Sequence, residues 1–329
     1  MRLKLVPGNS SINFFSRINS IFSISIFMML ASIFIYFLFG LNYGIDFRGG
    51  TMLMVQSEET VPISKYRYIL SSADVGGTSV TEISDPGAKI SSGMFDKKRN
   101  IVLIRIEQVD GQDSVQNDSI IKVKTKLAEE ISSIKFLQTD SVGAKVSKEL
   151  IRKGVISVIL AVSAVLFYIW IRFEWQFAVG AVFALIHDVI ITVGIFSLLS
   201  LEFNLSIIAA LLTIVGYSLN DTVIVFDRIR ENLKKFKKKP LVELLNLSVN
   251  ETLSRTVMTS VTTMIALTSL YILGGDVIRG FTFAMIWGVL IGTFSSIFVA
   301  SAALLVLGVK RDWSKPNAEV GTQFKDKNQ

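Results

Sequence analysis

Residues 205–226 have the sequence LSIIAALLTIVGYSLNDTVIVF, a hydrophobic run that contains the polar cluster GYSLNDT at positions 216–222. The run is typical of a membrane-spanning helix, since about 20 apolar residues cross the hydrocarbon layer of a bilayer. A carboxylate in that layer costs about 2.5–3.5 kcal/mol on insertion scales, and its usual uses are ion pathways, proton relays and salt bridges. The run therefore predicts a membrane protein, with Asp221 as the first candidate functional residue.

The composition agrees with several membrane spans and one polar domain. Half of the 329 residues are hydrophobic, and the mean hydropathy is +0.52. The chain has no Cys and one His, which excludes disulfides, Cys-based metal sites and multi-histidine metal sites. It also lacks the phosphate-binding motif G-x-x-x-x-G-K-[ST]. We therefore predict no metal, no cofactor and no ATP site.

The positive charge of the chain is concentrated in one place. The chain has a net charge of +7. Seven of its Lys and Arg residues lie between Arg228 and Lys239, directly after the apolar run. Such a cluster is typical of a cytoplasmic loop beside a membrane span. It accounts for the charge without a nucleic-acid partner.

Six segments are long and apolar enough to span a bilayer. An even number of spans with the basic loops inside places both termini in the cytoplasm, as residues 1–17 and as a polar tail at 310–329. The predicted spans are 18–41 and then, within 154–309, about 154–171, 175–199, 205–226, 256–273 and 281–309.

A polar insert at residues 42–153 separates the first two spans. Its patterns predict four strands and two helices in the order strand, helix, strand, strand, helix, strand, which is the order of a ferredoxin-like α+β domain. We expect this domain outside the cytoplasm, with a loop at 84–100. The predicted strands are 51–56, 78–83, 101–107 and 136–142, and the helices are 63–73 and 116–134.

Two further polar features accompany Asp221. Arg255 lies at the inner end of the fifth predicted span, and Thr259 and Thr262/Thr263 follow at helical spacing, so we expect this stripe to face the bundle interior. Arg255 could either balance the charge of Asp221 in a proton relay or form a fixed structural pair with it. The third span carries Asp188 among the small residues Gly180, Ala184 and Thr192. His187 is expected to point away from Asp188 and to serve as a packed side chain.

A glycine motif, GIDFRGG at 44–50, follows the first span. Gly44, Gly49 and Gly50 allow backbone conformations that other residues avoid, and Asp46 can accept a hydrogen bond within a turn. The motif predicts a tight turn that leads into the first strand of the insert.

Taken together, these motifs resemble the SecF family, the smaller membrane subunits of the SecDF protein-export complex, within the resistance-nodulation-division (RND) superfamily. The resemblance covers the chain from the first span to about residue 309. It rests on GIDFRGG at 44–50, VG at 142–143, ALIHDV at 184–189, GYSLNDTV at 216–223, FDRIREN at 226–232 and SRT at 254–256.

The resemblance implies an RND-half bundle of six helices in the bacterial inner membrane, with the ferredoxin-like domain between helices one and two. It implies a non-enzymatic subunit that uses the proton-motive force, with sodium as the alternative ion, to promote late steps of polypeptide export. The implied partners are SecD, the SecYEG channel, YajC, the translocating polypeptide and lipid. The implied proton relay is Asp221 with Arg255, and the accessory polar residues are Asp188, Asn220, Thr222 and Thr259.

Three other functions are compatible with the same residues. An RND-type exporter half for lipid or small molecules would have a similar bundle, although the insert is small for a substrate-binding domain. Asp188 and Asp221 could form an intramembrane aspartyl protease dyad, although the Gly-x-Gly-Asp motif is absent. A passive scaffold would carry Asp221 only as one member of a structural pair.

Overall fold

The computed structural model describes residues 11–309 except 74, 76, 84–99, 108–112 and 132. The described residues form two compact units. The helical unit lies within Met1–Leu41, Ser157–Leu201 and Ser206–Gln329, and the sheet unit comprises Asn42–Ile156 and Glu202–Leu205. The predicted tail at 310–329 and nearly all of the predicted loop at 84–100 lie outside the described residues.

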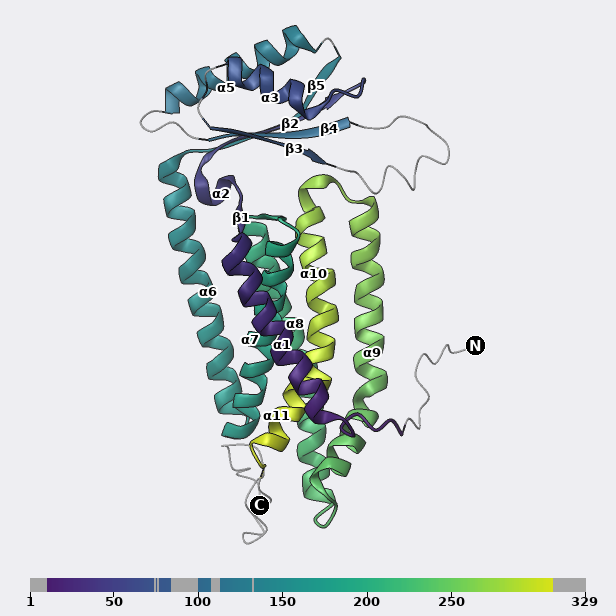
Figure 1. The fold of residues 1–329 in the computed structure, drawn as a ribbon. Helices are drawn as coiled ribbons and strands as arrows, with labels where there is room; N and C mark the ends of the chain where they lie inside the picture. Colours follow the sequence, from purple (N-terminus) through teal and green to yellow (C-terminus); the bar gives the residue numbers. More distant parts are fainter. Residues whose placement is uncertain are drawn as a thin grey trace. The chain divides into compact units, whose positions relative to one another are not determined.

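In the described part of the chain, six stretches of helix are long and apolar enough to cross a membrane, as predicted. The last stretch is not a continuous α-helix, because the π-helix η1 separates two α-helices within it. Figure 1 shows these helices as a bundle, in which α1 crosses in front of α7 and α8. Their bounds are α1 Ile18–Phe39, α6 Ala144–Arg172, α7 Trp175–Leu198, α8 Leu205–Lys235, α9 Leu241–Leu273, α10 Asp276–Phe294, η1 Ser295–Ala300 and α11 Ser301–Val306.

Three helices extend well beyond their predicted apolar cores. α6 starts at Ala144 instead of 154, α8 continues to Lys235 through most of the predicted basic loop, and α9 starts at Leu241 instead of 256. No Gly or Pro interrupts α8 after Gly216 or α9 after Pro240, so the backbone can stay helical beyond the apolar segment. The two extensions contact each other, since Asn232 Nδ2 donates to Ser248 Oγ at 2.9 Å.

Aromatic rings fill the centre of the helical unit. Phe173, Phe177 and Phe226 are almost completely buried, and their ring centroids lie 5.1–6.1 Å apart. Such pairs add about 0.5–1.5 kcal/mol each beyond the burial of their apolar area. This cluster connects the start of α7 with the middle of α8.

Glycines allow the helices to approach closely at several points. A Cβ at Gly194 of α7 would lie 2.4 Å from the Cβ and Oγ of Ser32 and 2.9 Å from its Cα. A Cβ at Gly288 of α10 would lie 2.3–2.8 Å from side-chain atoms of Ile214 in α8. Both contacts require glycine, so these positions set the spacing of α1 on α7 and of α10 on α8.

We expect Gly194→Ala to destabilise the helical unit by about 1–3 kcal/mol, the usual cost of adding a methyl group to a closely packed site. The midpoint of thermal unfolding of the full-length protein in detergent measures this effect. Gly280→Ala is the control, because its new Cβ would meet Ile207 at an ordinary 3.6 Å. Adding Ser32→Gly to Gly194→Ala should restore part of the loss. Equal midpoints for the two single variants would contradict this view of α1 packing.

The sheet unit has four antiparallel strands in the order β3-β4-β2-β5. Figure 1 shows α3 and α5 on the same face of this sheet. Between the sheet and the two helices lies a core that includes Leu53, Tyr66, Ile104, Val123 and Leu127. The bounds are β2 Gly50–Ser57, α3 Ile63–Ser72, β3 Thr78–Ile83, β4 Asn100–Ile106, α5 Asp113–Glu130 and β5 Ile134–Val142. The predicted helix 116–134 thus starts and ends a few residues early, because the chain enters β5 at Ile134.

Candidate functional site

Asp221 lies in the middle of α8 and is only 1% exposed. Neither of its carboxylate oxygens has a hydrogen-bond partner among the described residues. Four other buried oxygens of the helical unit are also unpartnered among the described residues, namely Ser25 Oγ of α1, Tyr217 Oη and Thr222 Oγ1 of α8 and Thr256 Oγ1 of α9. Buried polar groups are usually paired in native proteins. Asp221 is therefore not held in a hydrogen-bond network among the described residues.

Arg255, the predicted partner of Asp221, is in the middle of α9 because that helix begins at Leu241. The two side chains attract each other by charge. No hydrogen bond joins them, since both oxygens of Asp221 are unpartnered in the described part of the chain. The arrangement therefore brings a cation near the acid without the direct contact of a fixed ion pair.

The expected orientation of the α9 polar stripe is wrong. Arg255 and Thr262 are exposed and Thr259 is half-buried, whereas Thr256 and Ser260 are buried. Ser and Thr are so frequent in this segment that helical spacing alone does not distinguish two neighbouring faces. The interior face is the one that carries Thr252, Thr256 and Ser260. On α8, Thr222 is buried beside Asp221, whereas Asn220 is exposed.

Asp188 of α7 lies in a hydrogen-bond cluster and is fully buried. Its Oδ2 accepts hydrogen bonds from Ser218 Oγ of α8 at 2.6 Å and from Ser295 Oγ of η1 at 2.8 Å. His187 Nδ1 lies 3.0 Å from its Oδ1, so the expectation that His187 points away from Asp188 is wrong. The predicted small residues Gly180, Ala184 and Thr192 of the same helix are buried. Sequence reasoning missed Ser218 and Ser295 as members of this cluster.

The glycine motif lies in the sheet unit and contains more structure than a simple turn. A single helical turn, α2 Ile45–Arg48, precedes Gly49 and Gly50, whose φ angles are 72° and 115°. These positive values explain why glycine is needed before β2. The carboxylate of Asp46 accepts a hydrogen bond at 2.9 Å from the backbone N–H of Leu205, the first residue of α8, and not from its own turn.

Gly44 adjoins a short parallel pair of strands, β1 Asn42–Tyr43 and β6 Glu202–Phe203. Arg105 of β4 holds this pair, because its guanidinium bonds Asn42 Oδ1 and Tyr43 O at 3.2 Å and lies 3.3 Å from Glu202 Oε2. Burial raises the pKa of Glu202 above its ordinary value of 4.5, while the positive charge of Arg105 lowers it. The chain after α1 and the chain before α8 are thus joined through one buried arginine.

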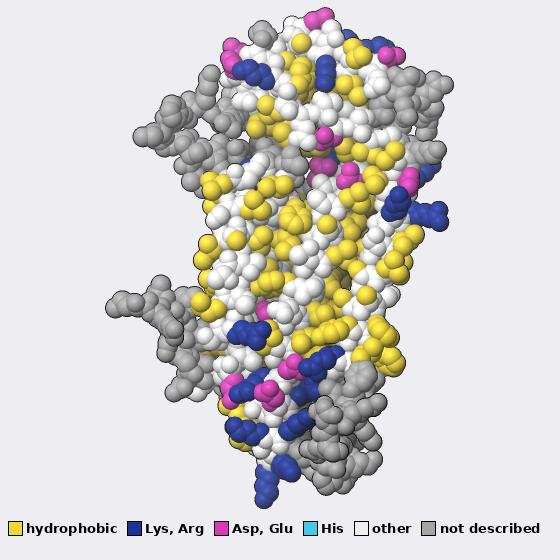
Figure 2. Space-filling model, turned by 180° about the vertical axis from the view of Figure 1, so that it is seen from behind, with side chains coloured by type: hydrophobic (Ala, Val, Ile, Leu, Met, Phe, Trp, Pro, Cys, Tyr) yellow, Lys and Arg dark blue, Asp and Glu magenta, His cyan; other side chains and the backbone are white. Residues whose placement is uncertain are grey.

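Charged side chains of the helical unit gather at the end where α8 and α9 are joined (Figure 2). There, Asp227 accepts hydrogen bonds from Arg172 at 2.8 Å and from Arg230 at 2.9 Å.

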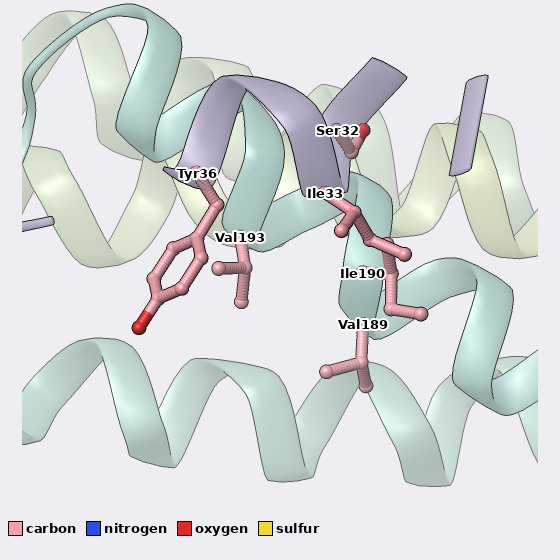
Figure 3. A pocket seen from close by; sticks show the side chains of 6 residues that line it. All are labelled: Ser32, Ile33, Tyr36, Val189, Ile190 and Val193. Atoms are coloured by element: carbon pink, nitrogen blue, oxygen red, sulfur yellow. The ribbon is translucent and has the colours of Figure 1, made fainter. Parts of the chain in front are cut away.

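A separate pocket of about 190 Å³ lies between α1 and α7. Figure 3 shows its lining, which has no charged side chain: Ser32, Ile33, Tyr36, Val189, Ile190 and Val193. The candidate chemistry therefore lies with Asp221 and Asp188 and not in this pocket.

Comparison with known proteins identifies the class of this bundle. The family described as protein export membrane protein SecD/SecF, C-terminal, matches residues 122–310, and the SecD/SecF GG motif matches residues 37–61. The chain therefore belongs to the SecD/SecF family of protein-export membrane proteins.

Relatives over nearly the whole length are SecF subunits in particular. The chain is 49% identical to protein translocase subunit SecF of Cereibacter sphaeroides, over 98% of each chain. It is 37% identical to the same subunit of Rickettsia rickettsii, over 95% of this chain and 97% of that one. The crystal structure of SecDF from Thermus thermophilus, a translocon-associated membrane protein, matches with a TM-score of 0.80 and 34% identity. That match covers 91% of this chain but only 39% of the SecDF chain.

Proposed function

We propose that this chain, an accessory subunit of the Sec translocase, uses the proton-motive force to promote late steps of polypeptide export across the bacterial inner membrane. The observation that carries the proposal is the state of Asp221, an acid that is 1% exposed and has no hydrogen-bond partner among the described residues. A buried carboxylate without fixed partners can bind and release a proton without breaking a network. Arg255 supplies the charge that makes the deprotonated form tolerable.

Protonation of Asp221 changes the forces between α8 and α9. The deprotonated carboxylate attracts Arg255, and a proton on the carboxylate removes most of that attraction. The two helices then favour a different arrangement, and the proton gradient drives the cycle because the two arrangements bind the proton with different affinity. Sodium is the alternative coupling ion. No ATP is required by this mechanism.

We infer that the sheet unit is a ferredoxin-like domain on the outer side of the membrane and that it responds to the helices. Its strand, helix, strand, strand, helix, strand order and its sheet order β3-β4-β2-β5 support that fold. α8 belongs to both units, because Leu205 lies in the sheet unit and the rest of the helix, including Asp221, lies in the helical unit. The Asp46–Leu205 hydrogen bond thus ties the glycine motif to the helix that carries the proton site.

The partner that best fits the exposed polar face of the helical unit is SecD. Asn220 of α8 and Arg255 and Thr262 of α9 are exposed, although they lie in helices apolar enough to span the membrane. Polar side chains in spanning helices normally face other helices and not lipid. A second helical subunit would cover them. SecYEG, YajC and the translocating polypeptide are the further partners, and the basic junction of α8 and α9 favours termini in the cytoplasm.

The experiment that tests the proposal measures export of a secreted reporter from sealed inverted vesicles with and without an imposed proton gradient. One set of vesicles contains the translocon with SecD and this chain, and the matched set lacks this chain. We expect the gradient to increase export only in the first set. An equal response of both sets would contradict a role of this chain in coupling and would favour a passive scaffold.

A further inference from the structure

The cluster around Asp188 differs from the Asp221 site because its polar groups are nearly all paired. Ser218 Oγ and Ser295 Oγ both donate to Asp188 Oδ2, at 2.6 and 2.8 Å. The Ser295 hydroxyl also lies 3.1 Å from Gly292 O, but the carboxylate is closer. His187 Nδ1 lies 3.0 Å from Asp188 Oδ1. The remaining polar atom of the cluster, His187 Nε2, is buried and has no partner among the described residues.

The number of protons in this cluster determines its charge. Asp188 Oδ2 already accepts two hydroxyl hydrogens. The first proton that His187 and Asp188 share therefore lies between Asp188 Oδ1 and His187 Nδ1. With this proton alone, the imidazole is neutral and the cluster carries one negative charge. A second proton, bound at Nε2, makes the cluster neutral overall, either as a carboxylate with an imidazolium or as a carboxylic acid with a neutral imidazole. Both side chains are 0% exposed, and an uncompensated buried charge is strongly unfavourable. A neutral cluster with two protons would avoid that cost.

Among the described residues, the elements that pack against α7 offer no cation near Asp188 to balance the charge. α1, α10, η1 and α11 pack against α7, and Ser218 places α8 beside it. α1, η1, α11 and α7 itself contain no Lys or Arg, and Tyr36 is the titratable residue of α1. α10 carries Asp276 and Arg279 at its start, more than a dozen residues before Ser295. On α8, Tyr217 and Asp221 are the titratable residues closest in sequence to Ser218.

We propose that His187 and Asp188 form a second proton-binding site, coupled to Asp221 through α8. Ser218 and Asp221 are three residues apart on this helix, which is about one turn. A movement of α8 on protonation of Asp221 changes the 2.6 Å contact between Ser218 and Asp188. A change in this contact alters the hydrogen bonds that the carboxylate of Asp188 accepts and thereby links the two sites. The coupling rests on the proposed function, whereas the site itself rests on the geometry of the cluster.

Gly292 keeps this cluster compact. A Cβ at this position in α10 would lie 3.1 Å from Ser218 Cβ and 3.6 Å from Asp188 Oδ2. The bare glycine therefore lets α10 pack closely over the carboxylate. This packing keeps the two-proton state away from solvent, so proton exchange requires movement of a helix.

The test uses the fact that the chain contains one histidine. The subunit is labelled with ¹⁵N-histidine, purified with a tag that contains no histidine, and reconstituted with unlabelled partner subunits in lipid vesicles. Its single imidazole signal then reports the protonation of Nδ1 and Nε2 as a function of pH. We expect Nε2 to carry a hydrogen at pH 7, and we expect Asp188→Asn to shift its titration midpoint by about one pH unit or more.

Milder variants keep the test independent of folding defects. Ser295→Ala removes a donor to Asp188 and should shift the midpoint in the same experiment. Ser296→Ala is its matched control, because Ser296 Oγ bonds Thr293 O and not Asp188. A wild-type imidazole that titrates near the ordinary value of about 6.5, unchanged in Asp188→Asn and Ser295→Ala, would overturn the site.

A second comparison separates the site from its coupling. Asp221→Asn should change the His187 titration if α8 links the two sites, and an unchanged titration would overturn the link. Asp188→Asn should reduce gradient-stimulated export at least tenfold in vesicles, and full stimulation would overturn the functional role of the site. The imidazole signal does not depend on export, so failure of the proposed function would not be mistaken for failure of this inference.

Discussion

Asp221→Asn is expected to reduce export with a proton gradient to the level measured without one, while the chain still inserts in the membrane. The amide has the shape of the carboxyl group but cannot take up and release a proton. It also removes the cost of a charge in the hydrocarbon layer, so the variant should be at least as stable as the wild type. The measurement is reporter export from sealed vesicles. Glu243→Gln, at an exposed acid in the first turn of α9, is the control and should respond like the wild type.

A double variant distinguishes a proton relay from a structural ion pair. If Asp221 and Arg255 only neutralised each other, Asp221→Asn would leave an unmatched cation, and adding Arg255→Met would restore function. If Asp221 carries the proton, the double variant stays unresponsive to the gradient. A normal response of Asp221→Asn alone would show that export needs neither the proton on Asp221 nor its pairing with Arg255, and it would favour the passive scaffold.

Arg105→Met is expected to loosen the sheet unit by about 2 kcal/mol. The estimate is below the 3–5 kcal/mol typical of breaking a fully buried pair, because about a quarter of the Glu202 side chain is exposed (24%). The variant removes the bonds of Arg105 to the β1 strand and leaves Glu202 without its cation. Hydrogen exchange of the β2 and β4 amides in the full-length protein measures the opening free energy. Lys135→Met, at an exposed ion pair, should change it little.

The same variant should show a defined pH dependence. Because the pKa of Glu202 is raised in the folded protein, the folded state binds the proton more tightly than the unfolded state. Stability therefore falls as the pH rises from the ordinary value of 4.5 through the raised value, and the loss persists above it. Arg105 limits that loss, so Arg105→Met should cost more at pH 7 than near pH 4. Adding Glu202→Gln should remove this difference, and an equal cost at both pH values would contradict the role assigned to Glu202.

The hydropathy of the chain and the spacing of its apolar residues predicted most helices and strands, because each helix or strand depends on residues that are close in sequence. The six spans and the four strands of the sheet unit follow from local patterns. The end of α8 and the start of α9 were not predicted by these patterns, because both extensions are amphipathic. The extension of α9 buries a stripe that includes Ser248 and Thr252. A search for apolar runs stops where charged residues begin, even when the helix continues.

The candidate site was predictable only in part. Asp221 and Asp188 stand out as acids in apolar runs, but Ser218 and Ser295 are ordinary residues until three separate elements meet at Asp188. Arg255 was identified by its type, whereas its exposed orientation depends on how α9 packs. Which face of a Thr-rich helix is buried is a tertiary property, and the spacing of its threonines does not determine it.

The π-helical segment Ser295–Ala300 gives the last span a property that a regular helix lacks. A π-turn holds one residue more than an α-turn, and one residue of an α-helix corresponds to a rotation of about 100° around the axis. The side chains on the two sides of this segment therefore point in directions that an unbroken α-helix would not give them. Ser295 lies at the start of the segment and donates to Asp188. The extra residue thus sets which side chains the last span presents to α7.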